Sequence, residues 1–177
     1  MFLLNANSYG KKNAPSWTPK MDSFAHFYEA KYSLPHGLMR AESLQESGYD
    51  TEASREENSY YNDGSLYAKN VTAEAKAFLD ACDYCQQTIE LERSQRGISF
   101  GLFQMLGENF RVAGYKKEFI DPTIDEQFDY AAKALSKLWN KYHSVALVAS
   151  CWNTGEPKNP NGKYAKNIVK YVNQFKY

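Results

Sequence analysis

The sequence predicts a mainly α-helical protein built as a single domain. Several segments place apolar residues three and four positions apart, which is the spacing of one helix face. A half-buried strand is marked by alternating apolar and polar residues, and no segment shows this pattern convincingly. Residues 49–71 are the one segment where a strand remains an alternative. The chain has 177 residues, of which 43% are hydrophobic, so it can bury one independent core.

The N-terminal part predicts an irregular arm followed by two helices. Residues 1–20 are mostly polar and contain two prolines, so we expect an arm that precedes a domain of residues 21–177. Residues 22–31 place aromatic side chains at helical spacing. We expect the next helix to open at Pro35, because proline suits the first helical position, and to end at Gly48.

Residues 49–93 break the helical pattern and are expected to form an insertion. Their first half, residues 49–71, is polar, and the tripeptide NDG at 62–64 is typical of a turn. One amphipathic helix should follow over residues 73–91, capped by Thr72. We expect the insertion to be peripheral to any chemistry, as a lid, a groove wall or a docking surface.

The cysteines do not predict a disulfide framework, because there are three of them. Cys82 and Cys85 fall on the apolar face of the expected 73–91 helix. A metal or redox pair is one interpretation, but burial in the core is favoured, since no second ligand pair or nearby histidine accompanies them. The three histidines are scattered, and we expect neither a metal nor another cofactor.

The second half of the chain predicts further helices. Residues 94–105 contain glycine and lead into a short helix, and the dipeptide DP at 121–122 introduces the most regular pattern in the chain. Its apolar stripe comprises Phe128, Ala131, Ala132, Leu135, Leu138, Trp139 and Tyr142. Ser144 can cap an apolar helix, residues 153–163 read as a loop, and residues 164–175 form a last helix.

Composition excludes several classes of function. Formal charge is zero at a pI of about 6.8, so we expect no nucleic-acid partner. The sequence contains no run of about 18 apolar residues, so we expect no membrane-spanning helix. The first apolar residues lack a preceding basic region, so we expect no secretory signal.

Glu46, at the end of the second expected helix, is the candidate for chemistry. The partial negative charge of a helix C-terminus disfavours an ionised carboxylate, and burial would add to this effect. A carboxyl that keeps its proton near neutral pH suits a general acid, and a glycosidic oxygen leaves readily only when protonated. By position alone, a solvated glutamate at a frayed end is the commoner case. Glu42, one turn earlier, is a second carboxylate for which we favour a solvated helix face.

Four short motifs in chain order give Glu46 more weight. They are ESG at 46–48, GLFQM at 101–105, CWNTG at 151–155 and Tyr164. Together they resemble the lytic transglycosylase family, the soluble-lytic-transglycosylase-like branch of the lysozyme superfamily. That family has a helix ending in Glu-Ser, then Gly-Leu-Met-Gln, Ala-Tyr-Asn-Ala-Gly and a tyrosine near the last helix. Each motif is weak alone, but the set spans about residues 24–175.

The resemblance implies a lysozyme-like fold and a set of site residues, with Glu46 as the sole acid and base. Three departures are Cys-Trp in place of Ala-Tyr before the asparagine, Phe103 in place of methionine, and a much longer separation between the first two motifs. The implied substrate-binding residues lie in the other motifs. Ser47 orients the acid or substrate, Gly101 lets sugar or backbone come close, and Phe103 lines the sugar cleft. Gln104 contacts substrate or supports the wall of the active site, Asn153 forms hydrogen bonds with sugar amides, and Tyr164 reaches the catalytic carboxyl.

The implied activity is cleavage of the β-1,4 bond between N-acetylmuramic acid and N-acetylglucosamine in peptidoglycan, leaving a 1,6-anhydromuramic product. The expected partners are glycan strands and other proteins of a phage tail or core, which places the protein in a virion that acts on the bacterial cell wall. Two alternatives remain: a goose-type hydrolase with a second carboxylate, and a structural or glycan-binding virion protein with weak or no activity.

Overall fold

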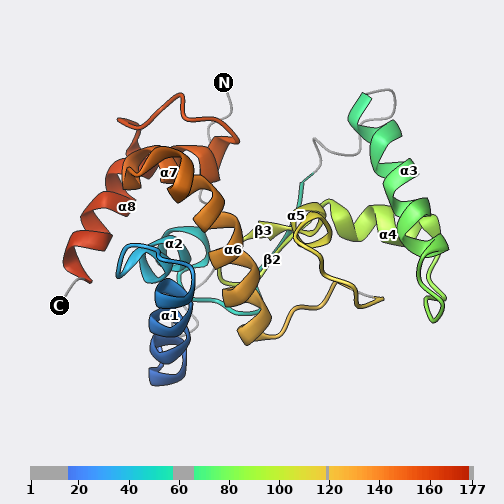
Figure 1. Ribbon diagram of the computed structural model, residues 1–177, viewed down its shortest axis with the longest axis horizontal. Helices are drawn as coiled ribbons and strands as arrows, with labels where there is room; N and C mark the ends of the chain where they lie inside the picture. Colours follow the sequence, from blue (N-terminus) through green and yellow to red (C-terminus); the bar gives the residue numbers. More distant parts are fainter. Residues whose placement is uncertain (1–15, 58–65, 119, 176–177) are drawn as a thin grey trace.

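The computed structural model describes residues 16–57, 66–118 and 120–175, with side chains from residue 71 in the second range. The described residues form eight helices and three short strands, so the predicted mainly α class is confirmed (Figure 1). The elements are α1 Pro19–Lys31, α2 Leu38–Ser47, β1 Ser54–Glu56, α3 Leu66–Asp80, α4 Ile89–Arg96, β2 Ile98–Phe100, β3 Met105–Leu106, α5 Gly107–Val112, α6 Ile124–Tyr142, α7 Val145–Thr154 and α8 Lys163–Gln174. Within these ranges, no helix combines the length and apolarity needed to cross a membrane.

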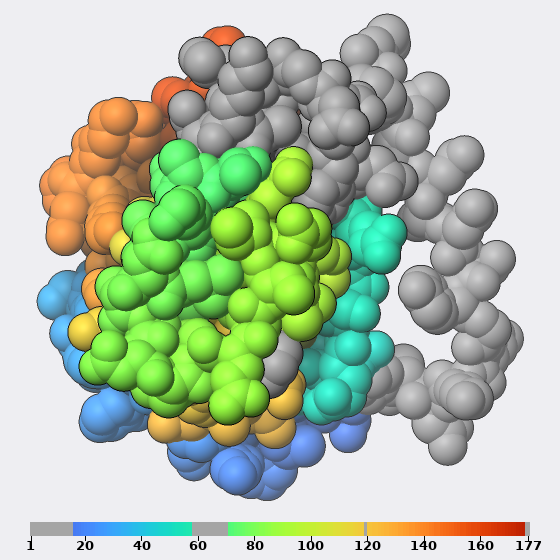
Figure 2. Space-filling model, turned by 90° about the vertical axis from the view of Figure 1, so that its right-hand side faces the viewer, coloured from blue at the N-terminus to red at the C-terminus, as the bar shows by residue number. Residues whose placement is uncertain are grey.

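These elements form two lobes with the small sheet between them (Figure 1). The helical lobe consists of α1, α2, α6, α7 and α8, and the insertion lobe consists of α3, α4 and α5. Helix α8 packs on both α2 and α7, while α3 packs on α4. Figure 2 shows α3 and α4 on the outer face of the insertion lobe. The helical lobe therefore joins segments from both ends of the chain.

Helix α6 carries the apolar stripe that the sequence predicts. The Thr123 hydroxyl accepts a hydrogen bond from the N–H of Glu126, and the Glu126 carboxylate accepts one from the N–H of Thr123. This reciprocal cap explains why the helix begins directly after the DP dipeptide. The fully buried part of the stripe is Phe128, Ala131, Ala132 and Leu135. The stripe packs on α1 and α7 and forms much of the core of the helical lobe.

Helix α2 ends where expected and begins later than expected. Gly48 adopts a left-handed conformation with φ 63°, and its N–H bonds to the Leu44 carbonyl, which closes the helix. Pro35 is not the first helical residue; its carbonyl accepts from Leu38 N–H in a preceding turn. Gly37, at φ 83°, separates that turn from the helix, because a left-handed residue cannot continue an α-helix.

The N-terminal arm is shorter than predicted. Helix α1 begins at Pro19, so the last two residues of the expected 1–20 arm are helical. Proline at the first helical position and Thr18 as the cap explain this start. Residues 1–15 and the NDG turn at 62–64 lie outside the described residues.

The single helix expected over residues 73–91 is wrong, because two helices occupy this part of the chain. Helix α3 ends at Asp80, and Thr88 caps α4 by accepting the N–H of Leu91. Thr72, the expected cap, lies inside α3. The intervening turn contains a disulfide between Cys82 and Cys85, so the core interpretation of these cysteines is also wrong.

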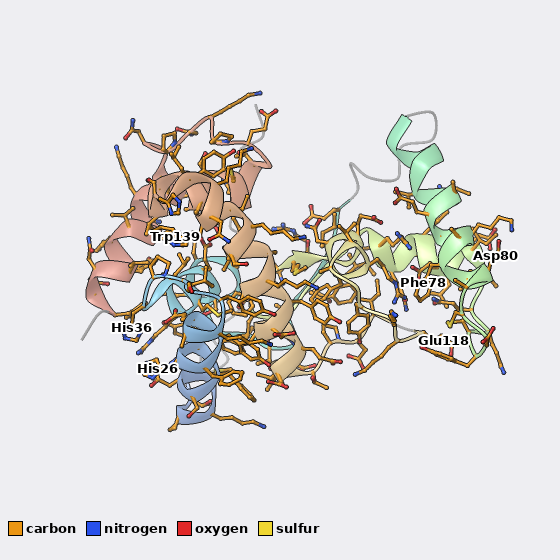
Figure 3. The ribbon with its side chains drawn as sticks, in the orientation of Figure 1. His26, His36, Phe78, Asp80, Glu118 and Trp139 are labelled. Carbon is orange, nitrogen blue, oxygen red and sulfur yellow. A yellow bond between two sulfur atoms is a disulfide. The ribbon has the colours of Figure 1, made fainter. Side chains whose placement is uncertain are left out.

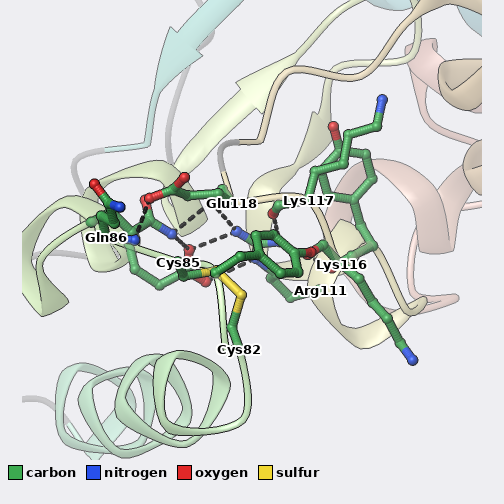
Figure 4. Close-up of a disulfide and its surroundings, with 11 residues drawn as sticks. Cys82, Cys85, Gln86, Arg111, Lys116, Lys117 and Glu118 are labelled. Carbon is green, nitrogen blue, oxygen red and sulfur yellow. Dashed lines mark hydrogen bonds and ion pairs between the residues drawn. A yellow bond between two sulfur atoms is a disulfide. The ribbon is translucent and has the colours of Figure 1, made fainter.

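That disulfide-closed turn docks on the segment before α6 (Figure 4). The Tyr84 hydroxyl donates to the Lys116 carbonyl at 2.7 Å, and the Gln86 N–H donates to the Glu118 carboxylate at 2.6 Å. A helix running from 73 to 91 could not bring these groups to the same segment. The third cysteine, Cys151, is free and buried in α7.

The insertion lobe has charged residues at its centre. Glu92 is 0% exposed and accepts hydrogen bonds from both Arg96 and Arg111, at 2.7 to 2.8 Å. Arg96 also donates to Glu108 at 2.8 Å, and the Arg111 guanidinium lies 3.8 Å from the centre of the Phe78 ring. Figure 3 places Phe78 in this lobe, away from the helical lobe. Buried ion pairs and a cation–π contact thus bind α3, α4 and α5 together.

The sheet between the lobes is antiparallel in the order β1-β2-β3. Strand β1 pairs with β2 so that Ser54 faces Phe100, and β2 pairs with β3 so that Phe100 faces Met105. Strand β1 falls inside residues 49–71, where the sequence left room for strands. Strands β2 and β3 were not expected, because three and two residues are too short to show alternation.

Candidate active site

Glu46 lies in the last turn of α2, as the sequence indicates. Its side chain is half-buried between α2 and α8, and so it can reach solvent. Burial raises the pKa of this carboxyl to about 7, and the charge of Glu57 adds to the rise. The hydroxyl of Tyr164 and the charge of Arg55 oppose it. Near neutral pH both the protonated and the ionised form of Glu46 are therefore populated.

Helix α8 places Tyr164 against this carboxyl. The Tyr164 hydroxyl lies 2.5 Å from Oε1 of Glu46, although the two residues are 118 positions apart in the chain. One further contact between the same two helices runs from Asn167 Nδ2 to Gln45 Oε1 at 3.1 Å. The structure thus brings Tyr164 to Glu46, where the resemblance puts it.

Glu42 is the site residue that the sequence interpretation missed. It is 0% exposed, and its Oε2 lies 2.7 Å from the Tyr164 hydroxyl, so a solvated helix face is wrong for this residue. Burial raises the pKa of Glu42 to about 8, with a further contribution from Glu46. The only signal in the sequence was the spacing of four between two acids, which places both on one face of α2. Whether that face is buried depends on α8.

The sheet brings two further charges to the site. Arg55 and Glu57 lie in and just after β1, and they form an ion pair with each other at 2.5 Å. The Ser99 hydroxyl donates to Glu57 at 3.0 Å, which holds this carboxylate against β2. Both charges act on the pKa of Glu46 from the polar half of the insertion, which therefore lies beside the candidate site.

Ser47 connects the end of α2 to the turn at residues 101–104. Its hydroxyl donates to the Leu102 carbonyl at 2.9 Å and accepts the Asp50 N–H at 3.1 Å. Gly101 has φ 67°, and a Cβ there would collide with the side-chain amide of Gln127. The group that comes close to Gly101 in this structure is therefore Gln127, a buried residue whose Oε1 accepts the Leu102 N–H.

Gln104 supports the wall of the site through its side chain. Its Nε2 donates to the carbonyl of Gly101 at 3.0 Å and to the carbonyl of Ala53 at 3.2 Å. These bonds hold the 101–104 turn to the segment that follows α2. Of the two roles that the resemblance implies for Gln104, the observed contacts are those of wall support.

Phe103 does not line a cleft, which corrects the role implied for it. Its side chain is 1% exposed and packs edge-to-face on Phe128, with ring centres 5.2 Å apart. The left-handed backbone at Gly101 and Gln104 turns this segment so that Phe103 points into the core. Asn153 is exposed in the last turn of α7, where its amide faces solvent.

A hollow of about 330 Å³ is lined in part by Gly101 and Gln127. Its lining includes Thr51, Phe100 and Thr123 but not Glu46. Within the described ranges, no group of three or more histidine, cysteine, aspartate or glutamate residues is arranged to hold a metal ion. Glu42, Glu46 and Tyr164 bring two carboxyl groups and a phenol within hydrogen-bond distance of one another, an arrangement suited to proton transfer.

Comparison of the chain with protein-family models, with curated proteins and with solved structures found no match. Functional inference therefore depends on the chemistry of the Glu42, Glu46 and Tyr164 cluster and on the order of the sequence motifs.

Proposed function

We propose that this protein is a peptidoglycan lytic transglycosylase with a lysozyme-like fold, in which Glu46 acts first as acid and then as base. The observation that carries the proposal is the half-buried Glu46 carboxyl. It lies beside the Tyr164 hydroxyl, and its pKa is about 7. A single group that must both give and take a proton works best when its pKa is near the working pH.

The proposed reaction uses one carboxyl and no water. Protonated Glu46 gives its proton to the glycosidic oxygen, and the bond from that oxygen to C1 of N-acetylmuramic acid breaks. The carbonyl oxygen of the substrate's own acetamido group then bonds to C1. In the second step the 6-hydroxyl attacks C1, the acetamido oxygen leaves, and ionised Glu46 takes the hydroxyl proton. The enzyme returns to its starting state, and the product carries a 1,6-anhydro ring.

Three features of the site support this scheme. Tyr164 holds one oxygen of Glu46, Ser47 ties the end of α2 to the 101–104 turn, and Gln104 fixes that turn to the neighbouring segment. Together they hold the acid in one orientation, which is what proton transfer to a bound sugar requires. Asn153, exposed at the end of α7, is the proposed contact for a sugar amide.

The test is Glu46→Gln, which keeps the shape of the side chain and removes its transferable proton. The wild-type protein should release 1,6-anhydromuropeptides from purified sacculi, as mass spectrometry of the soluble products would show. The Glu46→Gln variant should release none above background. Glu56→Gln, an exposed glutamate in β1, is the matched control and should act as wild type. Wild-type rates in the Glu46→Gln variant would reject Glu46 as the acid.

A hydrolase of the goose type is the second candidate, and Glu57 is the observation that favours it. Its carboxylate is near enough to raise the pKa of Glu46, and a second carboxylate is what a water-activating mechanism needs. A hydrolase would leave reducing muramic ends and would lose activity in Glu57→Gln. A transglycosylase should leave anhydro ends and keep most of its activity in that variant.

The biological setting belongs to the same proposal: carriage in a phage tail or core and action on the host cell wall, with glycan strands and virion proteins as partners. A glycan-binding virion protein without activity is the remaining alternative. Clearing of cell wall embedded in a gel separates them, because binding alone leaves the wall intact.

A further inference from the structure

Three side-chain oxygens meet between α2 and α8, and their contacts require more hydrogens than the tyrosine has. The Tyr164 hydroxyl oxygen lies 2.7 Å from Glu42 Oε2 and 2.5 Å from Glu46 Oε1. Each of these short distances needs a hydrogen between the two oxygens, and a phenol carries one. Two ionised carboxylates would leave one contact as a bare oxygen–oxygen repulsion.

The missing hydrogen comes from a carboxyl. Burial raises the pKa of Tyr164 well above its ordinary value of 10, so the phenol keeps its own hydrogen. One of the two glutamates is consequently protonated and donates to the tyrosine oxygen, while the tyrosine donates to the other.

Glu42 is the better place for that proton. It is 0% exposed, and its second oxygen, Oε1, is buried without a hydrogen-bond partner, whereas Glu46 reaches solvent. A bare, buried anionic oxygen costs far more than a bare carbonyl oxygen.

Glu29, a buried glutamate in the same lobe, has several hydrogen-bond partners for its carboxyl group. Its two oxygens accept the N–H groups of Gly37 and Met39, and His36 lies 3.1 Å away. Glu42 has no donor other than the shared tyrosine hydroxyl among the described residues. The surroundings of Glu42 suit a neutral acid.

We propose that Glu42 is a positioning residue that stays protonated at neutral pH and donates to Tyr164, so that the tyrosine's own hydrogen points to Oε1 of Glu46. With Oε1 occupied as an acceptor, the proton that Glu46 exchanges must sit on its other oxygen, Oε2. When Glu46 loses that proton, the Tyr164 hydroxyl is already aligned to stabilise the anion. The protonation pattern follows from the contacts and the burial of these three side chains, and its use in catalysis rests on the proposed function.

The proposal makes a prediction about charge. If Glu42 is already neutral, Glu42→Gln removes no charge, and the amide can donate to Tyr164 in its place. The pKa of Glu46 should then stay where it is. If Glu42 is ionised instead, the same substitution removes a buried negative charge beside Glu46 and should lower the pKa of Glu46 by about one unit or more.

The experiment is a ¹³C-NMR titration of protein labelled at the glutamate side-chain carboxyl, which needs no substrate. We expect one carboxyl in wild type to remain protonated at neutral pH, to disappear in Glu42→Gln and to persist in Glu46→Gln. The titration midpoint of Glu46 should be unchanged in Glu42→Gln. Glu42→Met, which also lacks a charge and fills a similar volume, should leave that midpoint unchanged and serves if the glutamine variant folds poorly.

Two results would overturn the proposal. One is a protonated signal that persists in Glu42→Gln and vanishes in Glu46→Gln. The other is a downward shift of the Glu46 midpoint in both Glu42 variants. If the titration gives the expected pattern but the protein fails to cleave sacculi, the proposed function fails and the proton assignment stands.

Discussion

Each of the two lobes contains a completely buried glutamate, and the two glutamates have opposite kinds of partner. In the insertion lobe, Glu92 lies between the guanidinium groups of Arg96 and Arg111, and both of its oxygens accept from arginine. In the helical lobe, Glu42 meets a single tyrosine hydroxyl and one more acid. Burial is equal, so the partners decide whether the side chain is an ion or a neutral acid.

This difference separates a structural use of charge from a chemical one. Glu92, between two arginines, joins α4 to α5 through hydrogen-bonded ion pairs. Glu42, beside a tyrosine and a second acid, has its pKa raised to about 8, and its neighbour Glu46 has a pKa of about 7, where a proton can be exchanged. The complete burial of a glutamate therefore does not indicate its function until the neighbouring groups are known.

The largest effect should come from breaking the charge compensation in the insertion lobe. Arg111→Met removes one partner of Glu92 and leaves an under-compensated buried carboxylate, so we expect a loss of about 3–5 kcal/mol in the free energy of unfolding. Denaturant unfolding monitored by circular dichroism would measure it.

An exposed ion pair of the same lobe supplies the control. Lys76 and Asp80 pair one turn apart on the surface of α3, with both side chains 62% exposed. Lys76→Met should cost less than about 0.5 kcal/mol. Equal losses in the two variants would contradict a structural role for the buried network.

A second test uses the pH dependence of stability in the helical lobe. A carboxyl whose pKa is raised on folding binds its proton more tightly in the folded state. Its contribution to stability is complete below the ordinary pKa of 4.5 and is lost as pH rises through about 8 for Glu42. Wild type should therefore become less stable between these pH values.

Glu42→Gln should flatten that slope, because the amide does not titrate. The free energy of unfolding of both proteins, measured by denaturant titration at a series of pH values, gives the two slopes directly. Parallel slopes would show that Glu42 does not carry the predicted proton.

The smallest effect concerns the tyrosine that joins the two acids. Tyr164→Phe removes the hydroxyl that lowers the pKa of Glu46, so this pKa should rise by about one unit. The other groups that face Glu46 are Glu42 on its own helix and Arg55 and Glu57 from the sheet, and all three remain. Because the protonated acid starts the reaction, the alkaline limb of kcat/KM should move to higher pH.

If the alkaline limb of the kcat/KM profile stays in place in Tyr164→Phe while kcat falls, Tyr164 contacts the substrate instead. Tyr171→Phe, on the same helix, is the matched control for loss of a tyrosine hydroxyl, and it should leave the pH profile unchanged.

Local pattern alone determined much of the helical lobe. The stripe of α6, the stop at Gly48 and the position of Glu46 one residue before the end of α2 follow from spacing and from residue types whose backbone preferences act over a few positions. The same local rules failed over residues 73–91, because an amphipathic pattern continued across a turn that Thr88 and the disulfide create.

Only the tertiary structure decided which of these residues form a site. Glu42 and Phe103 each had a wrong expected environment, since burial depends on what packs against a face, and α8 and α6 come from distant parts of the chain. Arg55 and Glu57 reach Glu46 because β1 pairs with β2, a register that no short-range pattern encodes. A sequence sets the chemistry of each side chain, but the proton that a carboxyl holds depends on neighbours that the fold alone brings together.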